Sequence, residues 1–131
     1  MNRGSGVLVV FLTTAACAAS GPRMFRFASD LRPADGRACA LGVLRRHGFG
    51  FPSVVAADSP AVAVRSPVRT SKGPGEWWRV ELSVGTDSDG HTLVTSVVGA
   101  SDREAGPFTA PPDPLQEVGA EITARCTWPA G

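Results

Sequence analysis

The chain has 131 residues, with 13 basic and 12 acidic side chains and a formal net charge of +1. A balanced charge argues against a general nucleic-acid binder, because such proteins use a basic excess to neutralise phosphates. The length suits one small domain with a modest core, so a second domain is not expected.

The first residues have the pattern of a secretory signal. Arg3 precedes an apolar run from Gly6 to Ala16, which has about half of the ~20 residues that a membrane-spanning helix needs. A basic start, a short apolar middle and small residues at the end are typical of a cleaved signal peptide. In this chain the small residues Ala15 and Ala16 lead directly into Cys17.

This arrangement resembles the signal peptide and lipobox of bacterial lipoproteins, with Thr14 where that family usually has a leucine-like residue. The resemblance implies that residues 1–16 are removed and that Cys17 carries a diacylglyceryl group and an N-linked acyl chain such as palmitate. Several acyl chains give stable anchoring to a membrane. Ala18 replaces the Asp that the family uses for inner-membrane retention, which implies the periplasmic face of the outer membrane where a cell has two membranes. The alternative is a plain secreted protein cleaved after Ser20.

Two further cysteines, Cys39 and Cys126, remain once Cys17 is assigned to the lipid anchor. An even pair in an exported chain predicts a disulfide, because such bonds form and persist in oxidising compartments. Closing so long a loop should stabilise the fold by about 4 to 5 kcal/mol in the chain-entropy model. The alternative is a pair of buried thiols that act as small apolar residues.

Residues 17–23 are expected to form a short tether and residues 24–131 a single α+β domain. Alternating aromatic side chains predict a first strand over Met24–Ala28. Apolar residues at three- and four-residue steps predict a helix from Pro33 to His47, which Gly48 ends. Positive side chains fill its last turn, where they face the negative end of the helix dipole. These residues are Arg45, Arg46 and His47.

Four more strands are predicted by runs of β-branched and alternating residues between turn signals. They are Ser53–Ala57, Ala61–Arg69, Glu76–Gly85 and His91–Ala100. In the third of these strands, Glu76–Gly85, alternate side chains are expected to face the core and the solvent. The inward set is Trp78, Val80, Leu82 and Val84, and the outward set is Trp77, Arg79, Glu81 and Ser83.

The segment Asp87–His91 contains part of the pattern of a calcium loop, but the further oxygen ligands that such a loop needs are missing. We therefore predict a hairpin turn there and no metal site, with Gly90 supplying the positive φ of the turn. A second helix opens at Asp113-Pro114. Its apolar stripe consists of Leu115, Val118, Ile122 and Cys126.

The predicted fold class is α+β, with an antiparallel meander sheet of four to five strands and two helices packed on one face, in the order β-α-β-β-β-β-α. In element order alone it is similar to the helix-grip type of small envelope lipoprotein domain, and that resemblance carries no motif. The sequence shows no nucleotide-binding loop and no nucleophile in a recognisable catalytic setting. We predict no catalytic residues and no cofactor.

The function that we predict is a lipid-anchored, non-catalytic binding or scaffold module of the bacterial cell envelope. Its partner would be an envelope protein or an anionic polymer, with no role for nucleic acid. The candidate binding surface is the solvent-facing side of the sheet, with Trp77, Arg79, Arg65 and Arg69. The alternative is a small envelope hydrolase, or an inhibitor of an envelope enzyme. A hydrolase would have to use His47 or His91 as its base.

Overall fold

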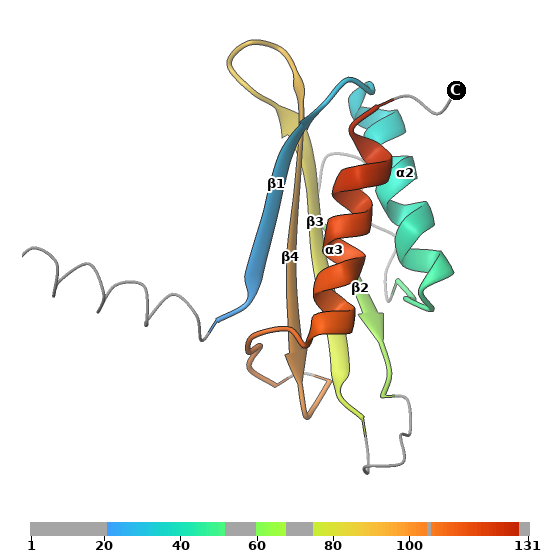
Figure 1. The fold of residues 1–131 in the computed structure, drawn as a ribbon, viewed down its shortest axis with the longest axis vertical. Coiled ribbons are helices and arrows are strands. Elements are labelled where there is room, and N and C mark those ends of the chain that lie inside the picture. Colours follow the sequence, from blue (N-terminus) through green and yellow to red (C-terminus); the bar gives the residue numbers. More distant parts are fainter. Residues whose placement is uncertain (1–20, 52–59, 68–74, 105, 129–131) are drawn as a thin grey trace, which may run out of the picture.

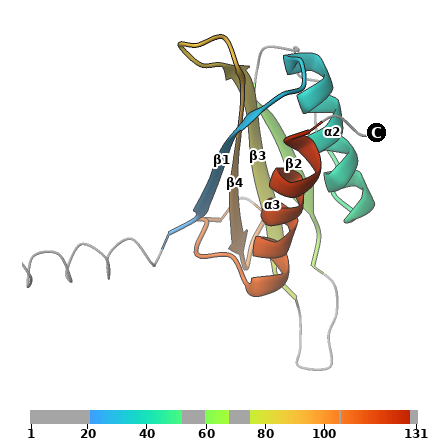
Figure 2. The ribbon, with the colours of Figure 1, turned by 45° about the horizontal axis from the view of Figure 1, so that its top comes forward.

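The computed structural model describes residues 21–51, 60–67, 75–104 and 106–128. Within these residues, four strands form one antiparallel sheet in the order β1-β4-β3-β2. Two helices lie on the same side of the sheet, as both ribbon views show (Figures 1 and 2). This arrangement confirms the predicted α+β class. The elements are β1 (Arg23–Ser29), α2 (Pro33–Arg46), β2 (Ala61–Arg65), β3 (Trp77–Thr86), β4 (Thr92–Ser101) and α3 (Asp113–Cys126).

The strand order departs from the simple meander in one respect. Strands β2, β3 and β4 pair in sequence order, whereas β1 pairs with β4 at the far edge of the sheet. The reason is that α2 follows β1 and carries the chain across the covered face before β2 begins. The predicted strand Ser53–Ala57 lies outside the described residues. Strand β2 also ends earlier than expected, at Arg65, and Pro67, which cannot donate to a sheet ladder, follows it.

Helix α2 starts with Pro33 in its first turn and ends at Arg46. Gly48 has a φ of 85°, a left-handed conformation that glycine adopts at little cost and that commonly closes a helix. The chain then reverses so that the backbone N–H of Phe49 donates to the carbonyl of Leu44 at 3.0 Å. Among the described residues, no helix combines the length and the apolar character needed to cross a membrane.

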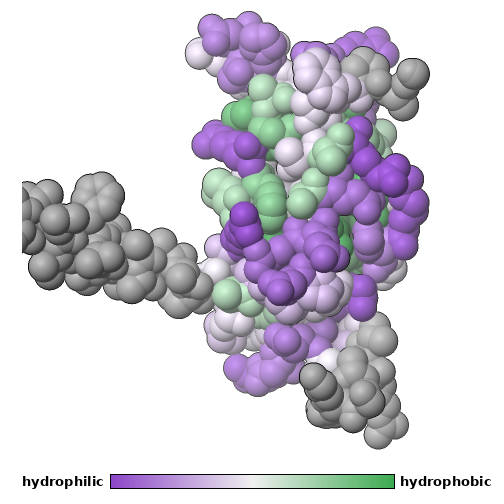
Figure 3. Space-filling view, viewed as in Figure 1, coloured by the Kyte–Doolittle hydropathy of each residue, from purple (hydrophilic) through white to green (hydrophobic). Residues whose placement is uncertain are grey.

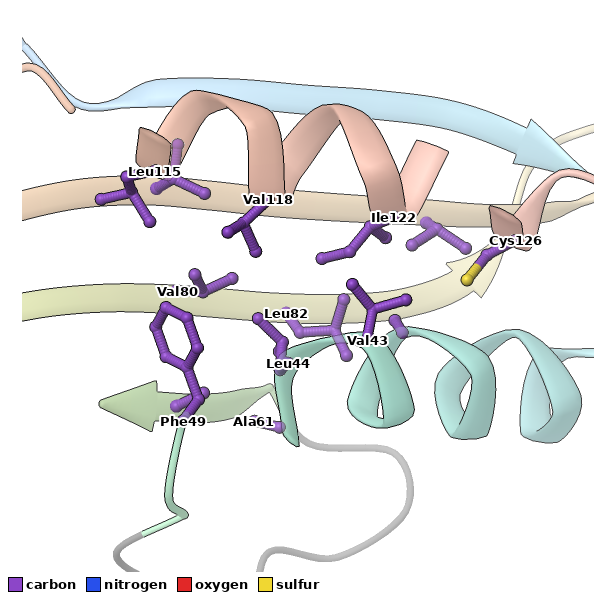
Figure 4. Packing of buried hydrophobic residues seen from close by; sticks show 14 of the residues in the cluster. Val43, Leu44, Phe49, Ala61, Val80, Leu82, Leu115, Val118, Ile122 and Cys126 are labelled. Atoms are coloured by element: carbon purple, nitrogen blue, oxygen red, sulfur yellow. The ribbon is translucent and has the colours of Figure 1, made fainter. Parts of the chain in front are cut away.

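The core lies between the two helices and the sheet. Leu115, Val118 and Ile122 point from α3 toward Val80 and Leu82 of β3 (Figure 4), and all five side chains are almost fully buried. Burying one such aliphatic side chain contributes about 1.5 to 3 kcal/mol. The predicted apolar stripe of α3 and the predicted inward set of β3 are therefore correct. In the space-filling view, hydrophilic side chains cover much of the domain, especially at its two ends (Figure 3).

A disulfide between Cys39 and Cys126 joins the two helices, with a Cα–Cα distance of 5.8 Å. The prediction of this bridge is confirmed. Next to it, the Ser29 hydroxyl donates to the carbonyl of Cys126 at 2.5 Å, and the backbone N–H of Asp30 donates to the carbonyl of Thr127 at 2.9 Å. The end of β1, the middle of α2 and the end of α3 are thus held together at one place.

Glycine also sets how closely α3 approaches β1. A Cβ atom placed on Gly119 would lie 2.5 Å from Cε2 of Phe25, far inside ordinary contact distance. By contrast, a Cβ atom on Gly42 of α2 would meet nothing within 4 Å. Only a residue without a side chain lets α3 settle on the Phe25 ring, whereas Gly42 has no such packing role.

Removing the disulfide should destabilise the domain strongly. In the double variant Cys39→Ala, Cys126→Ala we expect the free energy of unfolding to fall by about 4 to 5 kcal/mol, because the unfolded chain regains the entropy that the closed loop removes. Denaturant unfolding followed by circular dichroism measures this change. Thiol counting on the denatured, unreduced protein is the independent check, and two free thiols from Cys39 and Cys126 would contradict the bridge.

The two glycines should respond in opposite directions to the same substitution. Gly119→Ala should lower the free energy of unfolding by about 1 to 3 kcal/mol, because the new methyl group overpacks against Phe25. Gly42→Ala is the matched control and should raise the free energy of unfolding by up to about 1 kcal/mol, because alanine favours the helix. Equal effects of the two substitutions in urea unfolding would disprove the close packing of α3 on β1.

Candidate binding site on the open face of the sheet

Among the described residues, both helices cover one face of the sheet, and we call the other the open face. Strand register places the odd-numbered residues of β3 and β4 on it. It mixes aromatic, aliphatic and charged side chains, most of them partly exposed. On this face Arg79 pairs with Gly99 and Glu81 with Val97, and Trp77 lies at the start of β3.

Phe108 comes onto the open face from the segment that follows β4. Thr109 exchanges two backbone hydrogen bonds with Ala100, at 2.9 and 3.3 Å, and so fixes the position of the preceding Phe108. A Cβ atom on Gly99 would lie 2.9 Å from Cβ of Phe108. Glycine within a strand often marks such a close approach. The Phe108 ring therefore lies against the sheet because Gly99 has no side chain.

Arg79 lies between Phe108 and Glu81. Its guanidinium carbon is 4.4 Å from the centroid of the Phe108 ring, a cation–π distance, and its Nη2 is 3.2 Å from Oε1 of Glu81. The Arg79 Nε is buried and has no hydrogen-bond acceptor among the described residues. A buried donor without a partner costs about 1 to 3 kcal/mol.

A cavity of about 120 Å³ opens beside these side chains. For comparison, an apolar cavity of ~150 Å³ takes up a benzene molecule. The cavity therefore has room for a group of a few heavy atoms. Its polar wall consists of Arg79 and Glu81, and the rest is apolar or backbone. The lining residues are Pro22, Arg79, Glu81, Val97, Gly99 and Phe108.

The structure brings two of the four predicted surface residues together. Trp77 and Arg79 share the open face, two residues apart on β3. The expected position of Arg65 on this face is wrong, because Arg65 pairs with Trp78 and so faces the helices. Its guanidinium carbon lies 3.9 Å from the Trp78 ring. Arg69 lies outside the described residues.

The error over Arg65 concerns which of the two alternating sets of β2 side chains faces the helices. Ala61 and Ala63 are buried beneath the helices, whereas Val62 and Val64 lie half-buried on the open face. Alternation in the sequence separates these two sets, but only pairing with β3 decides which set faces the helices. In the structure, the smaller side chains face the core and Arg65 stacks on an indole at its margin.

Sequence reasoning missed Phe108, which forms part of the cavity wall. It stands in a polar, proline-rich connection, where no periodicity marks a buried or functional side chain. One signal was available, since an isolated aromatic residue follows shortly after Gly99, a glycine inside a strand. Such a glycine indicates that another part of the chain or a ligand comes close to the strand.

The basic last turn of α2 pairs with α3 and does not contribute to the open face. His47 Nε2 lies 3.2 Å from Oε1 of Glu121, and Arg46 and Arg125 lie 3.8 and 3.4 Å from Oε2 of the same carboxylate. This cluster links the two helices. His47 thus has a structural contact with the Glu121 carboxylate. As the base of a hydrolase, it would instead have to contact a serine hydroxyl.

Asp87, Asp89 and His91 form the turn between β3 and β4. Their ligand atoms lie within 4.8 Å of one another, close enough to share an ion. However, Asp87 Oδ1 already accepts the backbone N–H groups of Asp89 and His91, each at 2.9 Å, and Gly90 has a φ of 83°. These bonds are those of an Asx-type turn, so the geometry of the hairpin alone explains why these residues gather.

No protein-family model matches the chain, and no curated protein matches it closely enough to be called similar. The functional interpretation therefore depends on the residues of the open face themselves.

Proposed function

We propose that this chain is a lipid-anchored protein of the bacterial cell envelope whose α+β domain binds a component of that envelope without catalysing a reaction. The binding part rests on one observation. Aromatic and charged side chains line a cavity on the face that no described helix covers, namely Arg79, Glu81 and Phe108, and Trp77 lies on the same face two residues before Arg79. Aromatic residues and arginine are the types that most often dominate the energy of a binding surface.

The disulfide supports the export part of this proposal. A bridge between Cys39 and Cys126 forms and persists in an oxidising compartment such as the periplasm or the cell surface. It also accounts for two of the three cysteines in the chain. The third, Cys17, follows a signal-like sequence and is thereby available for acylation.

The mature N-terminus should carry lipid. Mass spectrometry of the protein purified from membranes should find Cys17 as the first residue, with the added mass of a diacylglyceryl group and an N-linked acyl chain. The variant Cys17→Ser should leave the membrane fraction, because stable attachment needs more than one acyl chain. A mature chain that begins at Gly21 and has no acyl mass would instead establish secretion after Ser20.

The open face should bind the partner. In the double variant Trp77→Ala, Arg79→Ala, we expect the amount of partner crosslinked in intact envelopes to fall at least tenfold. The physical reason is that a central aromatic or arginine residue typically contributes about 2 kcal/mol or more to binding. Quantitative mass spectrometry of the crosslinked complexes measures the change.

Ser83→Ala is the matched control, because Ser83 lies on the same face of the same strand, four residues beyond Arg79. It should leave crosslinking unchanged. Circular dichroism of both variants should show an intact fold, since all three side chains point away from the helix-covered core. Equal crosslinking by the double variant and the control would remove the open face as the binding surface.

A further inference from the structure

We propose that the cavity beside Phe108 binds the acetamido group of an N-acetylated amino sugar. This ligand class uses the open face already described, and so it rests on the proposed function and makes it more specific. The acetamido group would enter between the Arg79–Glu81 pair and the apolar wall, while the sugar ring would lie toward Trp77.

The charge of the site favours a neutral ligand that has both a donor and an acceptor. Arg79 and Glu81 form an ion pair, so together they carry no net charge. A simple anion would meet the Glu81 carboxylate, and a simple cation would meet the Arg79 guanidinium. A secondary amide suits both residues, because its carbonyl accepts from the part-exposed guanidinium of Arg79, which lines the cavity, and its N–H donates to the half-exposed carboxylate of Glu81.

The size and the walls of the cavity fit the methyl group of such an amide. Its volume of about 120 Å³ is somewhat below that of the ~150 Å³ cavity that holds benzene, which is ample for the four heavy atoms of an acetamido group. Val97, Phe108 and Pro22 supply apolar wall. The methyl group would be removed from water there, which favours the acetylated over the free amino sugar.

Trp77 favours a sugar over a peptide as the carrier of the amide. Its partly exposed indole lies two residues before Arg79 on the same face of β3, about 7 Å along the strand. This spacing places an aromatic platform next to Arg79, which lines the cavity. The apolar C–H face of a pyranose ring packs well on an indole, while the hydroxyl groups at its rim remain in water.

The test compares three monosaccharides that differ at one position. The full protein, purified in detergent, is titrated in a calorimeter with N-acetylglucosamine, glucosamine and glucose. For a ligand of this size we expect a Kd of roughly 1 mM for the acetylated sugar, and binding at least tenfold weaker for the other two. Equal affinity for all three sugars, or no binding of the acetylated one at 100 times that concentration, would overturn the proposal.

A pair of substitutions locates the binding in the cavity. Val97→Phe should fill the cavity and weaken the binding of N-acetylglucosamine at least tenfold. Leu93→Phe introduces the same ring on the same face of the same strand, opposite Gly85 and outside the cavity lining, and should leave the affinity unchanged. An unchanged affinity in Val97→Phe would show that the sugar binds elsewhere and would overturn the assignment of the site.

Two further outcomes separate the ligand class from the wider function. Tighter binding of N-acetylalanine N-methylamide than of the sugar would overturn the sugar in favour of a peptide. Failure of all the sugars, together with partner crosslinking that still depends on Trp77 and Arg79, would overturn the ligand class and leave the binding role of the open face intact. If no sugar binds and crosslinking does not depend on Trp77 and Arg79, the proposed binding function is overturned as well.

Discussion

The packing of both helices on a single face of the sheet is the constraint on which the rest of the structure depends. The inward residues of β3 and β4 meet the apolar stripes of α2 and α3, and the Cys39–Cys126 bridge prevents the helices from separating at one place. Because α2 must cross from one edge of the sheet to the other, β1 and β2 become the two edges. The opposite face is then free of helices within the described residues, and it can present side chains that the core does not need.

Two glycines bring aromatic rings against the opposite faces of this sheet. Gly119 lets α3 rest on Phe25 on the covered side, and Gly99 lets Phe108 rest on β4 on the open side. The two contacts have different consequences, although the geometry is alike. The first packs a partly buried ring against the core. The second builds one wall of a cavity next to an arginine whose Nε has no acceptor among the described residues.

Much of this fold follows from local sequence, whereas the binding site does not. The alternation of β3 and the stripe of α3 from Leu115 to Cys126 predict burial correctly, because each pattern repeats with the period of its own element. The disulfide follows from counting cysteines in a chain with a signal-like start. The face of Arg65 and the position of Phe108 depend instead on how one segment pairs with another. Neither leaves a periodic signal, since Arg65 is placed by the register of β2 against β3 and Phe108 by the bonds of Thr109 to Ala100.

The position of the cavity connects the anchor with the binding site. Pro22 lines the cavity, and β1 begins at the next residue, Arg23. If Cys17 carries lipid, four residues lie between the lipidated residue and Pro22 of the cavity wall, and the five Cα–Cα steps between them span at most ~18 Å when extended. The cavity would then lie close to the membrane surface whichever way the domain turns. A binding site held there would reach components near the membrane and would not reach across a wide periplasm. The short tether would therefore restrict the choice of partner, in addition to the chemistry of Arg79 and Glu81.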